Sequence, residues 1–144
     1  MRQAIALAAA LAAAAPAGAE APGGGPRPDP IAARLYPPEL VMSHQRELGI
    51  DDRQREAIIE QIEKAQSQIV KLQWQMQAAS EQLVKLLDAP RVDEAQALAQ
   101  AERVMSLERD LKKVHLALLI RIRNVLTDAQ RARLAELRRA APDR

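Results

Sequence analysis

Aromatic residues and cysteine are almost absent from this chain, and their absence narrows the class of fold. The 144 residues include one Trp, one Tyr, no Phe and no Cys. Sheet-rich folds draw their cores from aromatic and β-branched residues, whereas the apolar side chains here are mainly Ala and Leu. Without cysteine there are no disulfides, thiolate metal sites or cysteine nucleophiles. The composition therefore predicts an all-α protein that is stabilised by packing alone.

The chain also lacks a large excess of charge of either sign. The chain has 21 basic and 19 acidic residues, a formal net charge of +2, which does not by itself imply a polyanionic partner. We expect no nucleic acid, because the N-terminus described next predicts export. The glycines at 23–25 lie among prolines rather than between a strand and a helix, where a phosphate loop lies. The serines and the two histidines form no recognisable triad, and we expect no enzyme.

The N-terminus has the order of a secretory signal peptide. A short basic start, Met1-Arg2, precedes an apolar run over residues 4–15, and Ala17-Gly18-Ala19 is a small-residue cleavage site before Glu20. The run is shorter than the roughly 20 residues that span a bilayer. We therefore predict that residues 1–19 are removed, which leaves 125 of the 144 residues exported and without a membrane span. An uncleaved membrane anchor is the alternative.

The exported chain divides into a linker, a domain and a tail. Residues 20–35 form a Pro/Gly-rich linker with no apolar face to bury. Residues 36–140 form a helical domain, and residues 141–144 a tail. Within the domain, Gly49 and Pro90 punctuate long helical patterns. Helices are predicted over residues 37–48 and 51–88, from Asp93 onward, and over residues 127–140.

The long helix carries the strongest pattern in the sequence. Its apolar residues recur in steps of four and three over four heptads, which is the seam of a helix packed lengthwise against another. The third helix has an apolar residue every seven positions from Ala97 to Val125, although Gln100 and Arg121 interrupt its second row. We predict that the two helices fold back at Pro90 into a long antiparallel hairpin with short flanking helices. The seam consists of Ile58, Ile62, Ala65, Ile69, Leu72, Met76, Ala79, Leu83 and Leu86.

One short pattern occurs twice, 76 positions apart. Ile50-Asp51-Asp52-Arg53-Gln54 precedes the long helix, and Leu126-Thr127-Asp128-Ala129-Gln130 precedes the last one. In each copy the second residue is a helix N-cap, and the glutamine three positions later completes a capping box. The aspartate between them places negative charge at the positive end of the helix dipole. On this chemistry alone, the two copies predict two helix starts.

The paired pattern, its spacing and the signal peptide resemble the Spy/CpxP-like proteins of the bacterial periplasm, which carry two Leu-Thr-x-x-Gln motifs. The copy that begins at Leu126 matches the motif strictly, whereas the first copy has Asp51 in place of Thr. The resemblance covers about residues 36–140. It implies a hairpin that pairs into an elongated, curved homodimer in the periplasm, and a role in envelope stress as an ATP-independent chaperone or a heavy-metal sensor.

Histidines decide whether the sensor role applies. The related sensors place a second ligand four positions from the histidine, because residues so spaced share one helical face. Here leucines occupy those positions around both His44 and His115. We therefore expect no cofactor and two histidines at the solvent edge. A looser site for a divalent metal across the dimer, at these histidines and with Met42, Glu47 and Glu63 as further donors, is the alternative.

The candidate surface for unfolded proteins combines an exposed aromatic residue with a basic end. Trp74 falls outside the seam, where we predict a dimer contact or a role in client binding. Basic residues near the C-terminus are usually a solvated face, but they also attract acidic unfolded chains or anionic lipid surfaces. The candidate residues there are Arg131, Arg133, Arg138 and Arg139.

The function predicted from the sequence is reversible binding of unfolded or aggregating proteins by an exported helical homodimer. The alternative is a heavy-metal sensor that regulates a membrane-bound partner. A third hypothesis is a helical adaptor with a purely structural role.

Overall fold

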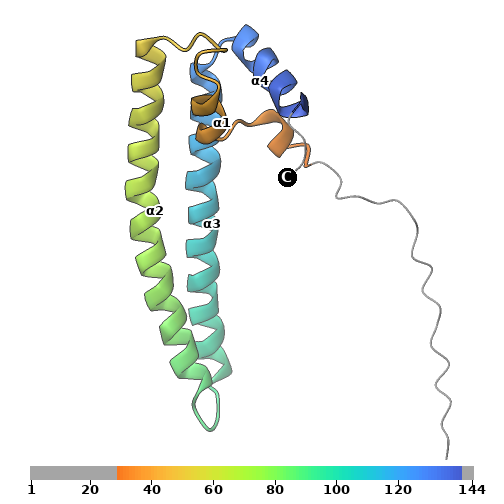
Figure 1. The fold of residues 1–144 in the computed structure, drawn as a ribbon. Coiled ribbons are helices and arrows are strands. Elements are labelled where there is room, and N and C mark those ends of the chain that lie inside the picture. Colours follow the sequence, from red (N-terminus) through yellow and green to blue (C-terminus); the bar gives the residue numbers. More distant parts are fainter. Residues whose placement is uncertain (1–28, 141–144) are drawn as a thin grey trace, which may run out of the picture.

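The computed structural model describes residues 29–140, and their regular elements are all helical (Figure 1). A 3-10 turn, Ala32–Arg34, precedes four α-helices: α1 (Pro38–Ser43), α2 (Asp52–Leu87), α3 (Glu94–Val125) and α4 (Asp128–Ala140). No strand occurs in this range, and the all-α prediction is confirmed. The predicted signal peptide and C-terminal tail lie outside the described residues.

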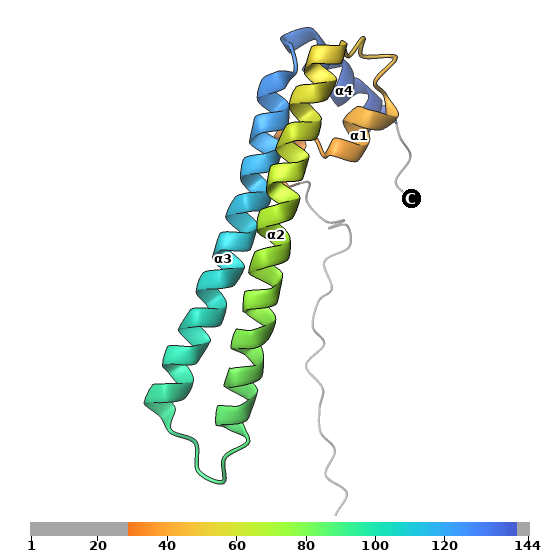
Figure 2. The ribbon, with the colours of Figure 1, turned by 90° about the vertical axis from the view of Figure 1, so that its left-hand side faces the viewer.

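The two long helices, α2 and α3, lie side by side and antiparallel (Figure 1 and Figure 2). α2 has 36 residues, or about 54 Å at 1.5 Å per residue. Every residue of the predicted seam is buried or half-buried, and Ile58, Ala65 and Ala79 are the most enclosed. The hairpin prediction is confirmed.

The packing face of α3 rotates near its C-terminal end. Gln100 is half-buried and donates from Nε2 to the carbonyl of Ala79 at 2.7 Å, so this polar interruption is satisfied within the hairpin. Arg121 stays exposed, and Ile122 is fully buried in its place. The step from Leu118 is therefore four residues instead of three, which follows the 3.6-residue period of a straight helix more closely. Strict heptad spacing does not predict Ile122.

One end of the hairpin carries the rest of the molecule. We call residues 29–62 and 118–140 the head, and residues 63–117 the shaft. α1 and α4 lie beside the ends of α2 and α3 that are farthest from the connecting loop (Figure 1 and Figure 2). Apart from Ala65, the main buried cluster belongs to the head. Its members are Tyr36, Val41, Leu48, Ile58, Ala65, Leu118, Ile122, Leu126 and Leu134.

The first helix is shorter than the predicted 37–48. α1 ends earlier, and residues 44–49 form a separate turn. This turn closes through a hydrogen bond from the Ile50 amide to the Gln45 carbonyl at 3.0 Å, as in a Schellman motif. Gly49 has a φ of 63°, the left-handed conformation that favours glycine. The break lets helix and turn each contribute a buried residue to the core.

Residues 29–35 lie inside the predicted linker, but they take part in the fold. Leu35 is buried. Arg138 of α4 donates to two carbonyls of this segment, at 2.9 Å in the case of Ala32. The same guanidinium lies 4.9 Å from the centroid of the Tyr36 ring, a cation–π contact. α4 therefore fastens the N-terminal segment to the head.

Candidate functional site

Both copies of the repeated motif begin a helix. At α2, Asp51 Oδ1 accepts from the Gln54 amide at 2.7 Å, and Gln54 Oε1 accepts from the Asp51 amide at 3.3 Å. At α4, Thr127 Oγ1 accepts from the Gln130 amide at 3.2 Å, and Gln130 Oε1 accepts from the Thr127 amide at 2.9 Å. Each box satisfies N–H groups that have no partner within their own helix.

The two motifs also bind each other, which the sequence analysis missed. Gln54 Nε2 donates to Gln130 Oε1 at 2.8 Å, and Gln130 Nε2 donates to Gln54 Oε1 at 3.1 Å. Each amide also donates to a main-chain carbonyl beside the other motif, Gln54 to Val125 at 3.1 Å and Gln130 to Leu48 at 3.2 Å. The start of α2 is thereby tied to α4. The only sequence signal for this pairing is that each glutamine lies three positions after the N-cap in its own copy.

The other motif residues support this junction. Leu126 is 2% exposed and belongs to the core, and Ile50 packs against that core while half-buried. Asp52 and Asp128 are exposed in the first turns of α2 and α4, where negative charge is favourable. Each pairs with the arginine three positions later. The motif therefore organises the head rather than presenting a reactive group.

Two of the C-terminal arginines make internal contacts. Arg131 donates to the carbonyls of Leu126 at 2.7 Å and Arg123 at 3.3 Å, at the negative end of the α3 dipole. Arg138 holds the N-terminal segment, as described above. These two residues therefore stabilise the head and are not a free cationic strip. Arg139 is exposed and donates to a carbonyl of its own helix.

A network of polar and charged side chains near the surface joins α4 to the 44–49 turn. Arg133 lies 3.7 Å from a Glu47 carboxylate oxygen and 3.1 Å from a Glu136 oxygen. His44 Nδ1 lies 3.2 Å from the other Glu47 oxygen. Such exposed pairs contribute little stability. Glu47 therefore links His44 to Arg133 of α4.

His115 lies in a different setting. It lines a cavity of about 420 Å³ between α1, α2 and α3, together with Met42 and Glu63. His44 is not among the described residues that line this cavity. Residues 29–140 contain no group of three or more His, Cys, Asp or Glu that could hold a metal ion. The donors predicted from the sequence are thus only partly brought together.

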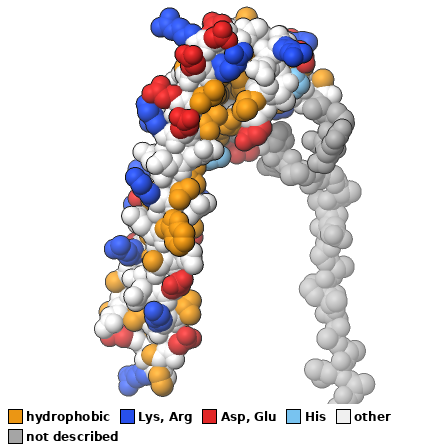
Figure 3. Space-filling view, turned by 60° about the vertical axis from the view of Figure 1, so that its left-hand side comes forward, with side chains coloured by type: hydrophobic (Ala, Val, Ile, Leu, Met, Phe, Trp, Pro, Cys, Tyr) orange, Lys and Arg blue, Asp and Glu red, His pale blue; other side chains and the backbone are white. Residues whose placement is uncertain are grey.

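The shaft exposes large apolar side chains along its length. Trp74 is exposed over 70% of its surface, in keeping with its position outside the seam. In Figure 3, hydrophobic side chains form a broken line from the head down the shaft, with charged side chains between them. The exposed apolar residues of the hairpin are Ile59, Val70, Trp74, Val84, Leu87, Val92, Leu98, Met105, Leu116 and Ile120.

Charged residues lie among these apolar side chains. Met105 and Leu116 line a shallow cavity of about 380 Å³ on α3, and the other residues around it are Glu108, Arg109, Lys112 and Lys113. On α2, Lys64 Nζ lies 2.5 Å from a Glu60 carboxylate oxygen, and its hydrogen bond and positive charge lower the pKa of Glu60. The shaft therefore mixes apolar contact area with charged groups of both signs.

The fold and its paired motifs define an all-helical hairpin protein whose head is closed by two hydrogen-bonded glutamines. The chain belongs to the heavy-metal resistance family, which it matches over residues 4–133. Proteins of this family are typically periplasmic. Among residues 29–140, no helix is both long enough and apolar enough to cross a membrane. No curated protein and no solved structure matches the chain.

Proposed function

We propose that this member of the heavy-metal resistance family is a periplasmic, ATP-independent chaperone that binds unfolded or aggregating proteins. The main support for this function is that exposed apolar side chains recur along the shaft. Trp74 is the most exposed of them. Single exposed apolar residues are ordinary. Here, however, a two-helix shaft leaves its outer faces without cover, and apolar residues recur over most of that length.

Cations on the same shaft keep such a surface soluble and add an electrostatic component to binding. Lys112 and Lys113 lie beside the exposed Met105 and Leu116. They replace Arg131 and Arg138 in the proposed client surface, because those arginines are engaged within the head. Capture of unfolded chains is then partly hydrophobic and partly electrostatic.

Light scattering of a reduced or heat-stressed substrate, with stoichiometric protein and no nucleotide, tests this function. We expect suppression of aggregation that weakens in Trp74→Ala and in Lys112→Gln/Lys113→Gln. It should also weaken as salt rises, because exposed charges are screened over about 8 Å at physiological ionic strength. Gln75→Ala, at an exposed neighbour of Trp74, is the matched control. Absence of suppression at severalfold molar excess excludes the chaperone role.

Heavy-metal binding is the second candidate function. The family description favours it, and so does the cavity that brings Met42, Glu63 and His115 together. Thioether and imidazole groups suit copper, nickel or cobalt. The fit is incomplete, because the described residues supply no group of three His, Cys, Asp or Glu for a metal. In this role the protein would regulate a membrane-bound partner in response to the metal.

A further inference from the structure

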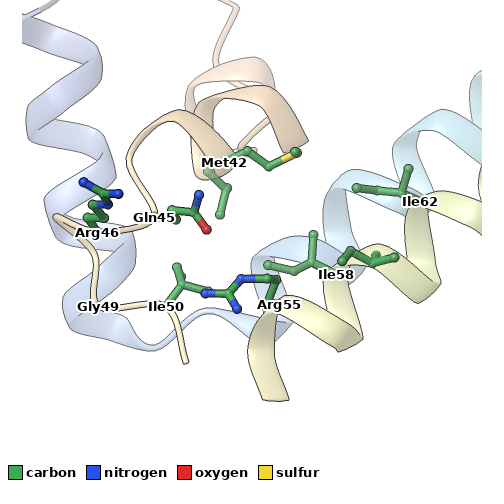
Figure 4. A pocket seen from close by; sticks show the side chains of 10 residues that line it. Met42, Gln45, Arg46, Gly49, Ile50, Arg55, Ile58 and Ile62 are labelled. Carbon is green, nitrogen blue, oxygen red and sulfur yellow. The ribbon is translucent and has the colours of Figure 1, made fainter. Parts of the chain in front are cut away.

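A cleft of about 580 Å³ lies in the head between α2 and the wall that α1 and the 44–49 turn form (Figure 4). Its deepest lining is apolar, since Val41 and Ile58 are 2% and 4% exposed. Met42 and Ile59 are large apolar residues of the same lining, yet they are 58% and 46% exposed. The cleft therefore presents apolar surface that the head leaves open.

The polar lining of the cleft is cationic. It consists of Gln45, Arg46 and Arg55, and none of the described residues that line the cleft carries a carboxylate. In Figure 4 the Gln45 amide and the Arg55 guanidinium lie on opposite sides of the opening, with Ile50 beside them. The Arg55 guanidinium forms an ion pair with an Asp52 carboxylate oxygen at 2.6 Å, and the Arg55 side chain remains 48% exposed. An anion at the opening would meet a guanidinium and an amide.

The wall opposite α2 is held in place before any ligand binds. The Ile50 amide donates to the Gln45 carbonyl at 3.0 Å, which fixes the main chain from which the Gln45 side chain projects. Val41 and Leu48 anchor α1 and the turn in the buried core. A site whose walls are fixed in advance loses less conformational entropy when it binds.

We propose that this cleft binds a single-chain anionic amphiphile, a medium-chain carboxylate such as decanoate. The hydrocarbon chain lies along Ile58, Ile59 and Ile62, and the carboxylate lies between Arg55 and Gln45. The volume is within the roughly 300–1,000 Å³ of small-molecule sites, and it suits one alkyl chain better than a helix about 10–12 Å in diameter. This binding is separate from client capture on the shaft.

Isothermal titration calorimetry of the full exported protein with decanoate, below its micelle concentration, tests the proposal. We expect octanoate to bind roughly tenfold more weakly, because it lacks two buried methylene groups. Decyltrimethylammonium has a comparable chain and the opposite charge, and it should not bind at the cleft. Equal affinity for the two decyl compounds, or no decanoate binding at millimolar concentration, overturns the proposal.

Variants locate the site. Arg55→Met should weaken decanoate binding about tenfold, whereas Arg55→Lys should keep most of the affinity. Ile59→Gln should weaken binding about as much as Arg55→Met. Val84→Gln is the matched control, an exposed apolar residue of α2 at the far end of the shaft. Circular dichroism confirms that each variant is folded. Binding that is lost in Val84→Gln but unchanged in Ile59→Gln contradicts the assignment.

Trp74 separates this proposal from the chaperone role. It lies 15 residues beyond Ile59 on the same helix, or about 22 Å along the axis, so its fluorescence should not change when decanoate fills the cleft. A change that saturates together with the calorimetric signal places the alkyl chain on the shaft and overturns the proposal. If Ile59→Gln weakens decanoate binding but still suppresses aggregation, the two activities are independent.

Discussion

Gln54 and Gln130 exchange hydrogen bonds through their side-chain amides, at 2.8 and 3.1 Å, although 76 positions separate them. Each oxygen also accepts from the N-cap amide of its own helix, and each nitrogen also donates to a main-chain carbonyl. Both amides therefore use their full hydrogen-bonding capacity. In the described residues, no buried side-chain nitrogen or oxygen lacks a partner. A single glutamine thus caps one helix and ties it to another.

Gln130→Met should lower the free energy of unfolding by about 1–3 kcal/mol, because the Leu48 carbonyl and the Gln54 amide lose their partner. Urea denaturation followed by circular dichroism measures the effect. Gln75→Met, on the exposed side of α2, is the control and should change stability by less than about 0.5 kcal/mol. The Gln54→Met/Gln130→Met pair should be non-additive by about 0.5–3 kcal/mol. Strict additivity contradicts the reciprocal bond.

An elongated homodimer is the second prediction. The shaft leaves large apolar residues uncovered. An interface that buries about 800 Å² on each copy covers part of them and leaves the others for clients. Light scattering after gel filtration should give twice the mass of one chain. A stable monomer at micromolar concentration contradicts this prediction.

Ile69→Asp tests how the seam supports the assembly. Ile69 is half-buried and packs against the core, so an unpaired charge there should unfold or dissociate the protein. Gln68→Asp introduces the same charge at an exposed neighbour and should leave mass and helicity unchanged. An Ile69→Asp variant with unaltered mass and melting temperature contradicts the seam's role.

Metal affinity is expected to be weak. Titration with zinc, copper, nickel and cobalt should give no dissociation constant tighter than about 10 μM, or about 7 kcal/mol of binding free energy. The reason is that leucines replace the helical ligand partners and His44 faces Glu47 instead of the His115 cavity. A submicromolar constant that His115→Ala or His44→Ala abolishes makes metal binding the leading function.

Processing of the N-terminus is the last prediction. Export should remove residues 1–19, because the short apolar run ends in a small-residue site before Glu20. Intact mass spectrometry of the periplasmic fraction should find a chain of 125 residues. Recovery of the uncleaved chain in the membrane fraction indicates an anchor and favours a sensor.

Helix starts and the hairpin seam were predictable from the sequence because they depend on neighbours a few residues apart. The Asp51 and Thr127 caps act on amides three positions later, and the seam follows from heptad spacing on one helix. Gly49 also ends its turn as its residue type predicts. These features need no knowledge of what packs against the helix.

Only the tertiary structure decided which distant groups meet. The pairing of Gln54 with Gln130 requires that α4 return to the start of α2. The internal roles of Arg131 and Arg138 depend on carbonyls that the folded head places within reach. Ile122 is buried where heptad spacing places Arg121, because the head adds packing partners at that end of α3. Local spacing determines each helix, whereas contacts between remote segments depend on how the helices assemble.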